Sequence, residues 1–81
     1  MSKYRAKIYI TLKNGILDAE GETVKKALNS LGFDALNVRS GKMYVIEFNC
    51  DEDPKNVVEK MCKQLLANPV VNNYYYELEE L

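Results

Sequence analysis

The chain has 81 residues, 47% of them apolar and 28% charged, which is typical of a small globular domain and excludes a disordered chain. Eleven Lys and Arg against twelve Asp and Glu give a net charge of −1, which argues against nucleic acid or an anionic membrane as a partner held mainly by charge. We therefore expect one domain over residues 1–81.

The first stretch predicts a strand followed by a helix. Apolar and polar residues alternate from Tyr4 to Lys13, which is the pattern of a strand with one packed face. Asp18 stands where a helix N-cap belongs, and an apolar residue recurs every three or four positions from Val24 onward. Gly32 supplies the left-handed cap that ends this helix.

The second half repeats these parts in another order. Residues 34–39 form a short predicted strand, residues 40–42 a tight hairpin turn, and residues 43–49 a third strand. Asp53 caps a second helix that ends before Pro69, and residues 70–78 form the last strand. The resulting βαββαβ order predicts an α+β, ferredoxin-like sandwich. Its antiparallel sheet would have four strands, with two helices on one face.

The residues offer little for catalysis or metal binding. Histidine is absent, which removes the commonest general base and nitrogen ligand. Cys50 and Cys62 lack C-x-x-C spacing and a secretory signal, so two reduced thiols in the cytoplasm are expected. No segment approaches the length of a membrane span, and no stretch matches the aromatic signature of an RNA-recognition module. We expect no catalytic residue, cofactor or metal in this chain.

Two surfaces are candidate interfaces. In the last strand, Tyr75 points to the face opposite Tyr74 and Tyr76, so it lies on the helix-free side of the sheet. A tyrosine-rich apolar patch is expected there, and we predict that it mediates self-association; it comprises Tyr9, Met43, Val45 and Tyr75. Contacts with other proteins are assigned to the start of the first helix and the basic hairpin, at Asp18, Gly21, Arg39, Gly41 and Lys42.

Three stretches together resemble PurS, the small subunit of phosphoribosylformylglycinamidine synthase. They are YITLKNGILDAEGETVKKALNSLGF, VRSGKMYVIEF and VEKMCKQLLANPVVNNYYYEL, which cover nearly the whole chain. The family usually has proline at the positions of Asn14 and Ala19, and both replacements keep the turn and cap chemistry.

The resemblance implies a non-catalytic subunit of purine biosynthesis. It would bridge the large synthetase subunit PurL, which uses ATP, and the glutaminase subunit PurQ, and would support ammonia transfer between them. The chain is expected to form a dimer or a dimer of dimers. The alternative is a stand-alone regulatory module of ACT type that binds an amino acid, with Gly15 in its binding loop.

Overall fold

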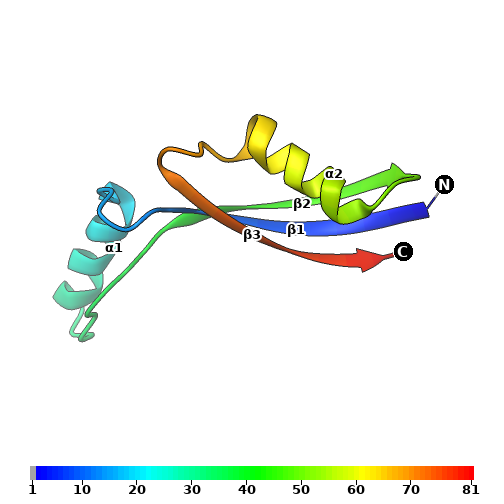
Figure 1. Ribbon diagram of the computed structural model, residues 1–81. Coiled ribbons are helices and arrows are strands. Elements are labelled where there is room, and N and C mark those ends of the chain that lie inside the picture. Colours follow the sequence, from blue (N-terminus) through cyan, green and yellow to red (C-terminus); the bar gives the residue numbers. More distant parts are fainter. Residues whose placement is uncertain (1) are drawn as a thin grey trace.

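The computed structural model describes residues 2–81. Its elements are β1 (Ser2–Leu12), α1 (Ala19–Ser30), β2 (Gly41–Cys50), α2 (Pro54–Met61), the π-helical turn η1 (Cys62–Leu66) and β3 (Asn72–Glu80). The strands form one antiparallel sheet in the order β2-β1-β3, and α2 lies across one face of it (Figure 1). The central strand is therefore the first one in the chain.

The core lies between this sheet and the helix above it. Alternation along β1 places every second side chain under the helix, and Ile8, paired with Tyr44 and Tyr76 on the neighbouring strands, is fully buried. The buried apolar residues are Ala6, Ile8, Ile10, Val58, Cys62 and Ala67. Burial of this face is what fixes the register of the sheet, because a slip by one residue would turn these side chains to solvent.

The prediction of a four-stranded sheet is wrong, because the sheet of residues 2–81 has three strands. Residues 33–40 are extended but are not part of the sheet, and they continue straight into β2 instead of folding back beside it (Figure 1). The expected turn at 40–42 does not form, since Gly41 already pairs with Thr11 in the sheet. The α+β class and the ferredoxin-like arrangement of the remaining elements agree with the prediction.

The placement of the first helix also differs from the prediction of two helices on one face. Only α2 and η1 cover the sheet, whereas α1 lies beyond the end of the strands (Figure 1). The sole buried residue of α1 is Gly21. We call residues 19–40, which comprise α1, the turn that ends it and the extended segment 33–40, the arm.

Both helices begin, and the first one ends, as their sequences predict. The second helix, predicted to continue up to Pro69, changes to the π-helical turn η1 after Met61. Asp18 accepts a hydrogen bond from the Gly21 backbone N–H, and Asp53 accepts one from Lys55, with Pro54 at the first helical position. Gly32 ends α1 at a φ of 96°, and the next N–H, of Phe33, donates to the Leu28 carbonyl at 3.0 Å. This is the Schellman arrangement, which only a residue tolerant of positive φ completes without strain.

The chain is too elongated for a domain that buries its own apolar surface. Its dimensions are 52 × 27 × 14 Å and its radius of gyration is 16.2 Å, against about 12 Å for a compact domain of this length. The arm accounts for this shape, because it extends past the sheet (Figure 1).

Candidate assembly surfaces

The arm is joined to the sheet by a group of four residues, Asp18, Gly21, Arg39 and Ser40, which we call the elbow cluster. Asp18 is only 5% exposed, and its carboxylate accepts three hydrogen bonds. One oxygen accepts from the Gly21 N–H at 2.9 Å and from the Ser40 hydroxyl at 2.7 Å, and the other accepts from the Ser40 N–H at 2.6 Å. These bonds tie the start of α1 to the start of β2.

Two further contacts complete the elbow cluster. The Arg39 guanidinium donates to the carbonyls of Leu12 and Lys13, at 3.0 and 3.3 Å, where the chain leaves β1. A Cβ at Gly21 would lie 2.5 Å from the Val38 carbonyl oxygen, so the first turn of α1 sits directly against the returning segment. The segment that follows β1 and the segment that precedes β2 therefore lie side by side, and their contacts fix the direction of the arm.

The hydrogen bonds of Asp18 also set its charge. The Ser40 hydroxyl, the Gly21 N–H and the Ser40 N–H favour the ionised carboxylate and lower the pKa of Asp18 to about 2. Asp18 thus accepts all three bonds as an anion throughout the neutral range.

All five residues predicted to contact partner proteins lie at this elbow. Asp18 and Gly21 are buried, and their polar groups or packing are used within the chain. Arg39, Gly41 and Lys42 are exposed. Lys42 and Gly41, together with Glu20 and Asn72, line a hollow of about 290 Å³. The structure thus brings the predicted residues together, and three of them are accessible to another protein.

The four residues of the predicted tyrosine-rich patch also lie together, on the sheet face opposite α2. Tyr9 pairs with Met43 on one neighbouring strand and with Tyr75 on the other. The rings of Tyr9 and Tyr75 stack with their centroids 4.6 Å apart, and Met43, Val45 and Tyr75 are each more than half exposed. This open-face patch is an apolar surface that no element of the described chain covers.

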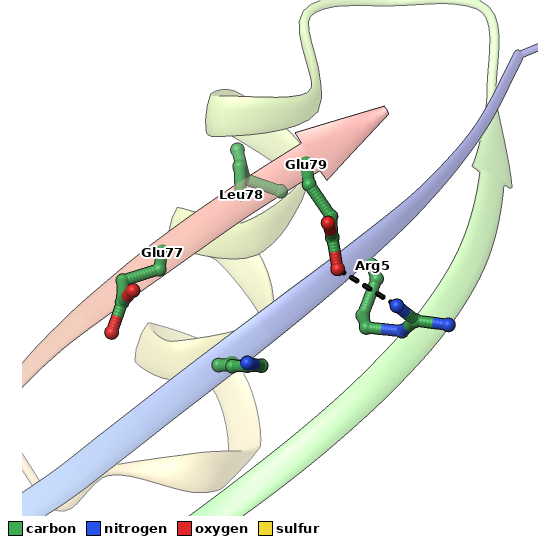
Figure 2. Close-up of a pocket in the computed structure, with 5 residues that line it drawn as sticks. Arg5, Glu77, Leu78 and Glu79 are labelled. Carbon is green, nitrogen blue, oxygen red and sulfur yellow. Dashed lines mark hydrogen bonds and ion pairs between the residues drawn. The ribbon is translucent and has the colours of Figure 1, made fainter. Parts of the chain in front are cut away.

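Next to the open-face patch lies a zone of paired charges. Arg5 on β1 donates to Glu47 on β2 at 2.9 Å and to Glu79 on β3 at 2.8 Å. Figure 2 shows the Arg5–Glu79 pair beside a hollow of about 120 Å³ that Glu77 and Leu78 also line. The hydrogen bonds that Arg5 donates to Glu47 and Glu79 raise its pKa. Exposed pairs of this kind contribute little stability, and one arginine beside two glutamates leaves the zone with a net negative charge.

A polar cluster under the helix was not predicted from the sequence. The Glu59 carboxylate of α2 accepts hydrogen bonds from the hydroxyls of Tyr74, at 2.5 Å, and Tyr76, at 3.2 Å, on β3. The bond to Glu59, with burial second, raises the pKa of Tyr74 to about 12. Burial raises the pKa of the nearby Cys62 thiol, which makes it a poor nucleophile. The helical spacing of Glu59 gave no sign that it faces the sheet beside two tyrosines.

The arm carries several large apolar side chains that are exposed. Val24, Leu31, Phe33 and Leu36 are exposed by 42, 75, 62 and 81%. The sequence predicted an apolar stripe on α1 from Val24 onward, which is the pattern of a helix with one buried face. Within residues 2–81, however, no element packs over these side chains.

Within residues 2–81, no three Cys, Asp or Glu side chains lie close enough together to bind a metal ion. None of the helices in that range is long and apolar enough to span a membrane.

Comparisons with known proteins all lead to one family. Residues 5–80 match the model of PurS, described as phosphoribosylformylglycinamidine (FGAM) synthase. The chain is 42% identical over 83 residues to phosphoribosylformylglycinamidine synthase subunit PurS of Methanocaldococcus jannaschii, covering 96% of this chain and 98% of the relative. It is 39% identical over 80 residues to that of Bacillus subtilis, covering 96% and 95%.

Solved structures agree. The Bacillus subtilis PurS structure superposes with a TM-score of 0.85 at 39% identity, over 95% of this chain and 99% of that one. A chain in the structure of PurLQS from Thermotoga maritima superposes with a TM-score of 0.79 at 31% identity, over the full length of both chains.

Proposed function

This chain belongs to the PurS family and is a subunit of phosphoribosylformylglycinamidine synthase, an ATP- and glutamine-dependent ligase of purine biosynthesis; we propose that it is the non-catalytic assembly subunit of that enzyme. The resemblance inferred from the sequence and the family assignment agree. No finding favours the alternative of an amino-acid-binding regulatory module.

The partners follow from a relative. The Thermotoga maritima chain is part of a structure of PurLQS. We propose that the present chain likewise assembles with a synthetase subunit PurL and a glutaminase subunit PurQ, and holds their sites in register for ammonia transfer. In this proposal ATP and glutamine are bound by those partners, and no cofactor binds here. The free thiols of Cys50 and Cys62 suit the reducing cytoplasm, where we place the complex.

The observation that carries the assembly role is the unpartnered arm. A chain of this size gains stability mainly by burying apolar side chains, yet Leu36 and Leu31 are 81 and 75% exposed. Monomeric proteins rarely leave such a continuous apolar surface uncovered. We propose that a second copy of this chain covers it.

The fold itself indicates how two copies fit. β2 is an edge strand with unpaired backbone groups, and the missing fourth strand would pair at that edge. The extended segment 33–40 has the apolar alternation of that strand, with Leu36 and Val38 in step. If each copy packs its arm against the other copy, segment 33–40 adds a fourth strand beside the partner's β2. The helix α1 then covers the part of the partner's sheet, on the face that carries α2, that α2 leaves open. Two equivalent exchanges make a closed dimer.

The open-face patch then provides a second contact. Stacked tyrosines and a methionine are common at interface centres. We propose that Tyr9, Met43, Val45 and Tyr75 join two exchanged dimers. The exposed elbow residues Arg39, Gly41 and Lys42 stay candidates for contact with the larger subunits.

The decisive experiment measures FGAM synthesis by the PurL and PurQ subunits with and without this chain. Glutamine-driven synthesis should require the chain, whereas ammonia-driven synthesis by PurL should not. Leu36→Asp should give monomers in light scattering and abolish the glutamine-driven reaction. Leu65→Asp is the matched control, because Leu65 is 83% exposed and lies outside the arm. Equal glutamine-driven rates with and without the chain would refute the assembly role.

A further inference from the structure

The elbow cluster has a feature that the proposed assembly role does not explain by itself. An exchanged dimer and a closed monomer contain the same contacts between arm and sheet, made to a partner in one case and to the chain's own sheet in the other. Their relative stability is therefore decided at the hinge, where the two conformations differ. Here the hinge is the chain around Ser40.

We infer that Arg39, supported by Gly21, is the positioning residue that holds the arm open and so directs it to a second copy. This inference rests on the arm exchange proposed above. Some contacts of the elbow cluster exist in both conformations, and others exist only when the arm is open.

The bonds of Asp18 do not distinguish the two conformations. Asp18 and Ser40 both lie at the same end of the sheet, next to the Thr11–Gly41 pair. A hairpin that turned at residues 40–42 would keep them neighbours. The bonds of Asp18 therefore join the start of α1 to the start of β2 in either conformation.

The bonds of Arg39 exist only in the open conformation. They reach the carbonyls of Leu12 and Lys13, which follow the central strand β1. In a closed hairpin, residue 39 would lie on the outer side of β2. Neighbouring strands are about 4.8 Å apart, so β2 would then separate the Arg39 backbone from that of β1 by roughly 10 Å. Closure would also move residue 39 back along the strand, away from Leu12. Both bonds would be lost.

The contact between Gly21 and Val38 also exists only in the open conformation. The first turn of α1 approaches the Val38 carbonyl so closely that a Cβ at Gly21 would lie 2.5 Å from its oxygen. Val38 precedes the hinge, so this packing also requires the returning segment to continue in line with β2. Gly21 permits this approach, and the Arg39 guanidinium holds the same segment to the end of β1 with two charge-assisted hydrogen bonds.

The test replaces Arg39 and measures assembly separately from stability. Arg39→Met keeps the length of the side chain but removes its donors, Arg39→Lys keeps one charged donor group, and Lys42→Met is the control for loss of a neighbouring cation. Each full-length variant is studied by light scattering over a dilution series, by hydrogen exchange at the amides of residues 34–39, and by urea unfolding. A fourth variant, with Asn-Gly inserted between Ser40 and Gly41, supplies a two-residue hairpin turn and shows that a closed monomer is accessible.

We expect Arg39→Met to raise the dimer dissociation constant by at least about tenfold, since both copies lose two bonds to a charged group. Its monomers should keep the amides of residues 34–39 protected, because the arm has closed on its own sheet. Arg39→Lys should restore much of the affinity, and Lys42→Met should match the unaltered chain. The insertion variant should be a protected monomer.

Each of the other outcomes refutes either the arm exchange or the role of Arg39. If the unaltered chain is monomeric, or leaves residues 34–39 unprotected as a dimer, the arm exchange itself is wrong. If the chain exchanges its arm but Arg39→Met dimerises with unchanged affinity, the exchange stands and the role of Arg39 is refuted. If Arg39→Met gives monomers with unprotected arms and a lower urea midpoint, Arg39 only stabilises the fold, and the inference is equally refuted.

Discussion

Replacing Ile8 by alanine tests whether the face of β1 under α2 is the true core of the subunit. Ile8 is 0% exposed and pairs with Tyr44 and Tyr76 on the neighbouring strands. Ile8→Ala removes three carbon atoms, worth about 2.4 kcal/mol of transfer free energy at about 0.8 kcal/mol each. The cavity left between sheet and helix adds to this, because rigid neighbours refill it only in part. We expect a total loss of about 3–4 kcal/mol per chain.

The assay is urea unfolding followed by far-ultraviolet circular dichroism. All variants are compared at one protein concentration, because assembly makes stability depend on concentration. The loss is large against the roughly 4–12 kcal/mol expected for a chain of 81 residues. Leu65→Ala, at an 83% exposed position, should change the free energy of unfolding by less than about 0.5 kcal/mol. A loss below about 1 kcal/mol for Ile8→Ala would show that this face is not the core.

Three further predictions concern single contacts. The pKa of Asp18 is lowered from 3.8 to about 2, so its stabilising effect should be complete above pH 3.8 and be lost as pH falls toward 2. Asp18→Asn should remove this acid-dependent decrease from the plot of urea midpoint against pH. An unchanged plot would contradict the prediction. Tyr74 has its pKa raised from 10.0 to about 12, so neutral Tyr74 stabilises the fold below pH 10 and this is lost between pH 10 and 12. Absorbance titration should show this late phenolate, and Glu59→Gln should lower its pKa. Gly21→Ala should cost about 1–3 kcal/mol in urea unfolding despite the better helix propensity of alanine, because its Cβ would overlap the Val38 carbonyl; a stabilised variant would refute the close approach.

Local signals in the sequence were sufficient for most elements. The alternation from Tyr4 to Lys13 predicted the central strand, and Asp18, Asp53 and Gly32 predicted three helix ends that the structure has at those positions. These features depend on neighbouring residues only. Side-chain alternation likewise placed Tyr75 on the face opposite the helix, next to Tyr9.

The error at residues 34–39 has a different origin. The apolar alternation there is that of a strand, and residues 40–42 suit a hairpin turn. Neither signal says whether the strand pairs within its own chain or elsewhere, because the side-chain pattern is the same. The choice depends on contacts between residues distant in sequence, such as Arg39 with Leu12. The contact of Glu59 with Tyr74 was missed for the same reason.

The first and last residues that the structure describes lie at the end of the molecule opposite the arm. The Leu81 N–H donates to the Lys3 carbonyl at 2.8 Å, and both ends lie at the far end of the sheet from α1 (Figure 1). A fluorophore, an affinity tag or a tether to a surface can therefore be attached at either terminus and will sit on the same side of the molecule. The elongated subunit can therefore be attached through the end that carries its termini, while the arm at the other end stays free to contact a second copy.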